Sequence, residues 1–176
     1  MLFDFFYLVL ELKKVPRKGW KSKASIEHPE SVADHSYGTA IMAMVLSDLQ
    51  KLDTQKIIKM ALLHDLAETI TGDFMPEEIS KEIKNISEKD AMNEILSKLP
   101  ENIAEEYIEI WQEYMQANTR ESILLHDIDK LEMAIQAAKY SSEGISSEKL
   151  SLFIDSAKKE IKSKELLEML DTLSYK

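Results

Sequence analysis

Apolar residues recur along most of the chain at intervals of three, four and seven positions, the spacing that places side chains on one face of an α-helix. The pattern predicts helices over residues 2–13, from 29 or 31 to 49, and from 53 or 54 to about 70. Residues 15–30 are predicted to form a connection, because two prolines and a glycine interrupt them. The fold class indicated is all-α.

The rest of the chain continues the helical pattern with a more charged composition. Helices are predicted over one or two surface segments in 77–99, from 100 to about 116, over 123–138, and over one or two segments in 147–173. The chain has 176 residues and shows no internal repeat or linker. It is therefore expected to form a single domain over residues 1–176.

Composition narrows the possible partners and metals. The formal charge of −10 argues against binding a nucleic acid polymer or a membrane surface. The sequence has no cysteine, so any metal must be held by His, Asp and Glu, a set that suits Mn, Co, Mg, Fe or Zn. The apolar stretch at the start lacks a basic n-region and is too short to span a bilayer, so the cytoplasm is the expected location.

The segment ALLHDLAETITGDFMP, residues 61–76, concentrates ionisable side chains on an otherwise apolar helix. On a continuous helix, Glu68 lies four positions after His64 and three after Asp65, and therefore on the same face. Asp73 follows in a Thr-Gly-Asp turn. Burying such groups is unfavourable unless a cation neutralises them. The segment therefore predicts a metal-dependent hydrolase.

A metal in the core of a helical bundle needs ligands from more than one helix. His35 lies on the apolar face of the preceding helix, where a hydrogen-bonded core histidine is the alternative interpretation. A further acidic ligand is expected from the later core helix, and helical spacing does not choose between Asp127 and Asp129. His126 and Asp127 form a second His-Asp pair without the acidic residues that follow the first one.

Three segments resemble the HD-domain phosphohydrolases: SVADHS at 31–36, ALLHDLAETITGD at 61–73 and DIDKLEMAIQA at 127–137. LKKVPRKGW at 12–20, followed by PESVADHS, resembles more narrowly the 5′-deoxynucleotidase-like branch. The resemblance implies an HD-domain helical bundle whose metal and substrate site lies within about 12–140. The C-terminal helices in 147–173 are left for packing or oligomerisation.

The resemblance also implies the roles of individual residues. One divalent metal ion would be ligated by His35, His64, Asp65 and Asp129. Asp73 would orient or deprotonate the attacking water, and Glu68 would help to protonate the leaving oxygen, although the sequence does not settle how these two divide the work. Open coordination positions would remain for water and a phosphate oxygen.

Substrate contacts are implied for the segment that precedes the metal ligands. Arg17 matches a phosphate-binding arginine, Trp20 matches a tryptophan beside the sugar, and Lys23 is the nearest cation after Trp20. The structural alternatives are a core anchor for Trp20 and a surface ion pair for Arg17. His126 is expected to be a decoy or a residue that orients a ligand.

The predicted activity is hydrolysis of nucleoside 5′-monophosphates, with deoxynucleotides preferred, to nucleoside and phosphate. One alternative is hydrolysis of another phosphorylated nucleotide at the same site. A second is a non-catalytic, metal-stabilised bundle that binds a nucleotide or a partner. The resemblance also implies a homodimer, with the first helix and the C-terminal helices as the contact surfaces.

Overall fold

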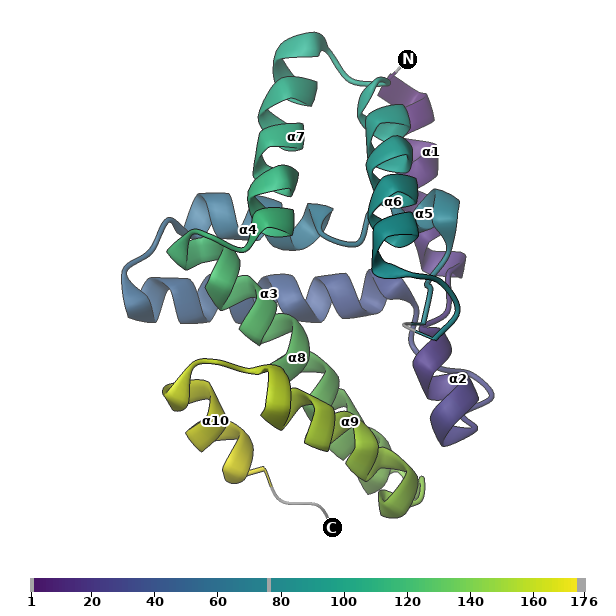
Figure 1. Ribbon diagram of the computed structural model, residues 1–176, viewed down its shortest axis with the longest axis vertical. Coiled ribbons are helices and arrows are strands. Elements are labelled where there is room, and N and C mark those ends of the chain that lie inside the picture. The colour runs from purple at the N-terminus through teal and green to yellow at the C-terminus, as the bar shows by residue number, and fades with distance from the viewer. Residues whose placement is uncertain (1, 76, 174–176) are drawn as a thin grey trace.

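The computed structural model describes residues 2–75 and 77–173, and every regular element within those ranges is a helix (Figure 1). In chain order these are α1 (Leu2–Glu11), the 3-10 turn η1 (Leu12–Lys14), α2 (Lys18–Ala24), α3 (Val32–Gln50), α4 (Thr54–Leu63), α5 (Glu68–Thr71), α6 (Lys81–Leu96), α7 (Glu101–Gln116), α8 (Arg120–Ser142), α9 (Ser147–Glu160) and α10 (Lys164–Asp171). The predicted all-α fold class is confirmed.

The two longest helices begin at reciprocal caps. The Ser31 side chain accepts from the Asp34 backbone N–H, and the Asp34 carboxylate accepts from the Ser31 N–H at 2.9 Å. Thr119 and Ser122 form the same arrangement at the start of α8. Each cap satisfies backbone donors that the first helical turn leaves free, which fixes where α3 and α8 enter the core.

The core lies where α3, α4 and α8 pack on one another (Figure 1). Helix α7 covers α4 and α8 on one side, and α9 packs along the C-terminal half of α8 on the other. Fully buried apolar side chains fill the space between them, among them Val32, Ile57, Met60, Leu125 and Ile128. The apolar faces predicted from helical spacing therefore meet in one core.

Helix α2 was not predicted, because Gly19 and the neighbouring prolines marked residues 15–30 as a connection. Its stability comes from tertiary packing that overrides local propensity. The Trp20 ring is 1% exposed and packs on Phe153 and Tyr140, with ring centroids 4.0 Å and 5.2 Å away. Gly19 lets α2 approach α9 closely, because a Cβ there would lie 3.4 Å from the Phe153 ring.

The single helix predicted from 53 or 54 to about 70 is wrong, because the chain breaks into α4 and α5. Between them the backbone forms tighter bonds to the third preceding residue, including Leu66 N–H to Leu63 O at 3.1 Å and Glu68 N–H to Asp65 O at 3.0 Å. The His64 imidazole contacts the Ala61 carbonyl, the acceptor that residue 65 would use in a continued α-helix. The His64 side chain thus competes with the backbone N–H of residue 65 for the Ala61 carbonyl.

The segment after α5 differs from the prediction in where the next helix begins. Pro76, expected in the first turn of that helix, lies outside the described residues. Helix α6 begins at Lys81, where the Ser80 side chain caps it by accepting from the Ile83 N–H. None of the described helices combines the length and apolar character that crossing a bilayer requires.

Candidate metal centre

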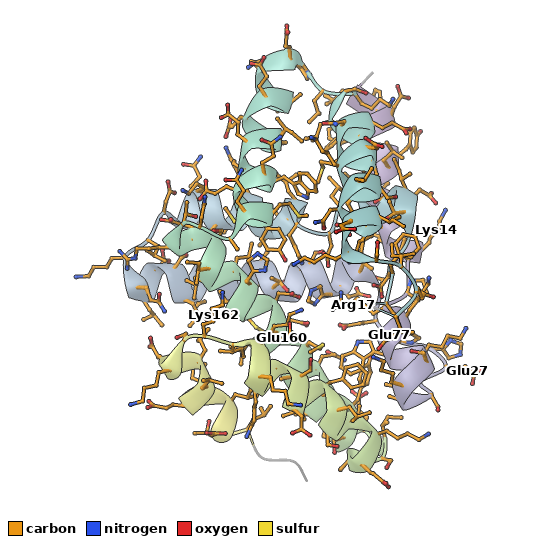
Figure 2. All side chains as sticks on the ribbon, viewed as in Figure 1. Lys14, Arg17, Glu27, Glu77, Glu160 and Lys162 are labelled. Atoms are coloured by element: carbon orange, nitrogen blue, oxygen red, sulfur yellow. The ribbon has the colours of Figure 1, made fainter. Side chains whose placement is uncertain are left out.

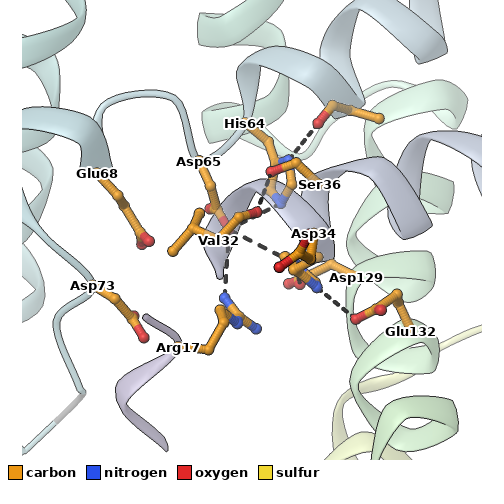
Figure 3. Close-up of polar contacts among 12 residues, drawn as sticks. Arg17, Val32, Asp34, Ser36, His64, Asp65, Glu68, Asp73, Asp129 and Glu132 are labelled. Atoms are coloured by element: carbon orange, nitrogen blue, oxygen red, sulfur yellow. Dashed lines mark hydrogen bonds and ion pairs between the residues drawn. The ribbon is translucent and has the colours of Figure 1, made fainter. Parts of the chain in front are cut away.

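His64 and Asp65 lie at the break after α4, where both side chains turn into the core (Figure 3). His64 Nδ1 lies 2.6 Å from the Ala61 carbonyl oxygen and must donate, since a carbonyl oxygen only accepts. This leaves His64 Nε2 facing Asp65 Oδ2 at 3.1 Å. The backbone thus fixes the orientation of the His64 ring and its tautomer.

His35 projects from the first turn of α3 and is fully buried. Its Nδ1 lies 2.5 Å from Glu132 Oε2, whereas its Nε2 lies 3.0 Å from Asp129 Oδ1 and 3.8 Å from Asp65 Oδ2. Burial and Arg17 lower the pKa of His35, but the contacts with Asp129 and Glu132 outweigh them and raise it to about 9. A cation bound at Nε2 would displace that proton.

Helix α8 turns Asp127 and Asp129 toward different partners. Asp127 points away from the histidines and accepts the backbone N–H groups of Lys162 at 2.9 Å and Ser163 at 2.8 Å. It therefore anchors the segment before α10. Asp129 faces His35, and its second oxygen lies 3.2 Å from Lys130 Nζ.

The side chains at this point fit a divalent cation. The Nε2 atoms of His35 and His64 are buried and have no hydrogen-bond partner among the described residues. These two atoms and a carboxylate oxygen of Asp129 all lie within 4.8 Å of one another, and Asp65 borders both imidazoles. Imidazole nitrogens with carboxylate oxygens suit Mn, Co, Fe or Zn.

The acidic groups around this point differ in how strongly they hold a proton. Burial opposes ionisation of Asp65, but His64 and Arg17 outweigh it and hold the Asp65 pKa far below its usual range. For Asp129, Lys130 and His35 outweigh burial in the same way. Burial raises the pKa of Glu68 well above its ordinary value, and the charges of Asp65 and Asp73 raise it further. Such divergence is typical of working sites.

Glu68 and Asp73 lie on the same side of the cluster (Figure 3). Glu68 is 2% exposed and is therefore a buried carboxyl group. Asp73 Oδ2 accepts the Lys18 backbone N–H at 2.7 Å, which ties the Thr-Gly-Asp turn to the start of α2. Neither residue belongs to the set of groups that converge on the two imidazoles.

Arg17 is brought to the cluster by a short backbone pairing. Its N–H donates to the Glu30 carbonyl at 3.0 Å, and Val32 N–H donates to the Val15 carbonyl at 2.8 Å. This pairing aligns the start of α2 with the start of α3. The guanidinium then lies 3.5 Å from Asp65 Oδ2 and points inward (Figures 2 and 3).

A cavity of about 930 Å³ opens beside these groups, within the usual range for small-molecule sites. Arg17, Glu68 and Asp73 line it at the end near the imidazoles. Trp20 and Lys23 line it as well, although most of the Trp20 ring is buried in packing and Lys23 pairs with Glu77 at 2.8 Å. Its walls include Leu152, Phe153, Ser156 and Glu160 of α9, beyond the 12–140 range expected from the sequence.

Sequence reasoning missed three polar residues at the site. Glu132 lies one turn after Asp129 on the same face of α8, a spacing that could have identified it. Lys84 Nζ lies 3.8 Å from Glu68 Oε1, but the weak periodicity of residues 77–99 hid it. Lys130 contacts Asp129 directly. His126 stacks on Tyr114, and its Nε2 contacts the Tyr114 carbonyl at 2.9 Å, so it packs at the cavity wall.

The helical fold and the cluster of histidines and aspartates point to a class of protein. The family model described as HD domain matches residues 9–169, and the chain belongs to this family. It is 37% identical over 173 residues to human 5′-deoxynucleotidase HDDC2, covering 98% of this chain and 84% of the human protein. It is 41% identical over 166 residues to the protein of that name from Dictyostelium discoideum, covering 88% and 87%. The resemblance found in the sequence is confirmed.

Solved structures agree with this placement. A conserved hypothetical protein from Pyrococcus furiosus superposes with a TM-score of 0.79 at 34% sequence identity. The match covers 97% of this chain and 98% of that one. The PH0347 protein from Pyrococcus horikoshii gives a TM-score of 0.77 at 33% identity, with 97% of each chain covered. The similarity therefore extends over the whole helical arrangement.

Proposed function

We propose that this chain hydrolyses nucleoside 5′-monophosphates, with deoxynucleotides preferred, to nucleoside and inorganic phosphate. The observation that carries the proposal is the convergence of two buried imidazole nitrogens, neither of which makes a hydrogen bond within the described part of the chain, with the carboxylates of Asp65 and Asp129 beside a cavity. Arg17, Glu68 and Asp73 line the same end. The relatives named 5′-deoxynucleotidase support the same substrate class.

The metal-binding residues in this proposal are His35, His64, Asp65 and Asp129. A divalent ion held there would polarise a phosphate oxygen and lower the pKa of a bound water. Arg17 would donate two N–H groups to phosphate oxygens, since its guanidinium is planar and already faces the ligands. The candidate metals are Mn, Co, Mg, Fe and Zn.

The two remaining carboxyl groups would divide the proton transfers. Asp73 would accept the proton of the attacking water as the new P–O bond forms. Glu68 would give its proton to the 5′-oxygen as the P–O5′ bond breaks. The raised pKa of Glu68 supports this assignment, because a carboxyl group that retains its proton can serve as the acid.

The test is phosphate release from purified protein supplied with Mn²⁺ or Co²⁺, measured on matched deoxy- and ribonucleoside monophosphates. Release should fall to background in H64A, D65A and E68A while circular dichroism stays unchanged. H28A serves as the control, because His28 is exposed and lies away from the cavity. Full activity in all three site variants would overturn the proposal.

We also propose a homodimer in which α1 forms the contact. None of the described α1 residues is buried, and Phe3, Phe6 and Leu10 lie on one face and are 70%, 48% and 50% exposed. An exposed apolar stripe of this kind is typical of an interaction surface. Light scattering should give twice the chain mass, and F3E/F6E should give the monomer. The cytoplasmic location stays a prediction.

A further inference from the structure

Glu132 contacts the candidate metal centre from the side opposite the cavity. Its side chain is 6% exposed, and Oε2 accepts from His35 Nδ1 at 2.5 Å. This contact fixes which nitrogen of the imidazole bears the hydrogen and leaves Nε2 for the cluster. Figure 3 shows Glu132 on α8 one turn beyond Asp129. Helix α8 therefore supplies both the candidate ligand Asp129 and the carboxylate that contacts a second candidate ligand, His35.

Gly38 makes room for this carboxylate. A Cβ added at Gly38 would lie 3.0 Å from Glu132 Oε1 and 3.4 Å from its Cγ. Gly38 is one turn after His35 on α3. The glycine therefore allows α8 to place a carboxylate against α3 at the level of the His35 ring.

The two imidazoles are held by different kinds of acceptor. His64 Nδ1 donates to the Ala61 backbone carbonyl, whereas His35 Nδ1 donates to a side-chain carboxylate. A carboxylate is the stronger acceptor and makes the imidazole a better electron donor at Nε2. A substitution of Glu132 can therefore remove the acceptor that orients His35, whereas no side-chain substitution removes the backbone carbonyl that orients His64.

We infer that Glu132 is a positioning residue that holds His35 for metal binding, with Gly38 as the space it requires. This inference rests on the metal centre of the proposed function but not on the identity of the substrate. Glu132 is not among the residues that line the cavity. Its effect should therefore appear in metal affinity before it appears in turnover at saturating metal.

A second ion between Glu30, His35 and Glu132 is the rival interpretation, since side-chain donor atoms of these residues also lie within 4.8 Å of one another. A neutral imidazole has one lone pair, and Nε2 of His35 faces the first cluster. Glu30 Oε1 already accepts from Trp20 Nε1 at 2.8 Å. These contacts favour one ion per chain, with Glu132 hydrogen-bonded to the ligand His35 and not bound to a second ion.

The experiment is calorimetric titration of the metal-free full chain with Mn²⁺, with thermal unfolding in chelator measured in parallel. E132Q should bind one Mn²⁺ per chain about tenfold to a hundredfold more weakly. Its phosphate release should recover as Mn²⁺ is raised. D127N is the matched control, because Asp127 is a buried carboxylate of the same helix that only caps the segment before α10. It should change stability and leave Mn²⁺ affinity intact.

Gly38→Ala is the second test variant, because it removes no polar group and changes only the space available to Glu132. G38A should weaken Mn²⁺ binding in the wild-type background and have no effect in an E132A background, where its clash is absent. Wild-type affinity in E132Q, equal effects of G38A in both backgrounds, or two ions per chain would each overturn the inference. Loss of affinity in a protein that hydrolyses no nucleotide would refute the proposed function and leave this inference standing.

Discussion

The two ends of the cavity are built in different ways. At the metal end, the histidines and aspartates come from α3, the break after α4, and α8, and all of them are buried except Asp65, whose side chain is 18% exposed. At the other end, the wall comes from the short helix α2, from residues 74 and 75, and from α6 and α9. A charged group of this wall pairs near solvent, as Lys23 does with Glu77. We therefore propose that the buried metal end is the rigid part that sets the chemistry, and that the more exposed wall is the adaptable part that contributes to recognition.

The largest effect should follow removal of a ligand at the rigid end. D129N should lower phosphate release by more than about a hundredfold, because the metal would lose an anionic ligand. Mn²⁺ affinity should fall in the same variant, measured by calorimetry. K162A, on the segment that Asp127 caps, is expected to match the wild type. Equal activity of D129N and K162A would contradict the assignment of Asp129 as a metal ligand.

Glu68→Gln should have the next largest effect and should separate proton transfer from metal binding. Release from a deoxynucleotide should fall by about 10²-fold, whereas Mn²⁺ affinity should stay within a few-fold. An aryl phosphate needs less protonation of its leaving group, so the deficit of E68Q should shrink with that substrate. The deficit of D73N should stay the same for both substrates. The reverse pattern would exchange the roles of Glu68 and Asp73.

Trp20→Phe should test the adaptable wall. The substitution keeps a ring against Phe153 but removes the Nε1 donor to Glu30 and some bulk at the cavity. The preference for deoxy- over ribonucleotides, measured as a ratio of kcat/KM values, should fall by about tenfold or less. kcat on the deoxynucleotide should hold, because the metal end is untouched. An unchanged ratio would assign Trp20 to packing alone.

The smallest effect should appear in stability as a function of pH. Burial and the charge of Glu132 raise the pKa of Glu30 to about 7, from an ordinary value of 4.5. Between these values the folded chain binds more protons than the unfolded chain, so this group makes the free energy of unfolding fall as pH rises. E30Q should flatten that decline in denaturant titrations performed in chelator between pH 4.5 and 7. An unchanged slope would contradict the assigned environment.

Helical spacing was sufficient for the long core helices and insufficient for the elements that shape the site. Apolar periodicity predicted α3 and α8 because their buried faces extend over several turns. Helix α2 was missed, since its stability depends on contacts of Trp20 with a segment more than a hundred residues away. The break after Leu63 was missed because the His64 side chain competes for the Ala61 carbonyl, which spacing alone does not encode.

The candidate metal ligands also differ in how far the sequence alone could identify them. His35 and His64 could be selected from the sequence because few histidines were available and both fall on apolar faces. Asp127 and Asp129 are both buried, and the choice required knowing that Lys162 and Ser163 turn their N–H groups toward Asp127. The resemblance to a family supplied Asp129, and the geometry of α8 gives the physical reason.

The central claim is that three separate segments hold one divalent ion beside Arg17 at the metal end of the cavity. A crystal structure of the Mn²⁺-loaded chain, with anomalous scattering recorded, tests it most directly. The account predicts one anomalous peak about 2.0–2.3 Å from Nε2 of His35 and His64 and from carboxylate oxygens of Asp65 and Asp129. A peak between Glu30 and Glu132, or none near the two imidazoles, would contradict it.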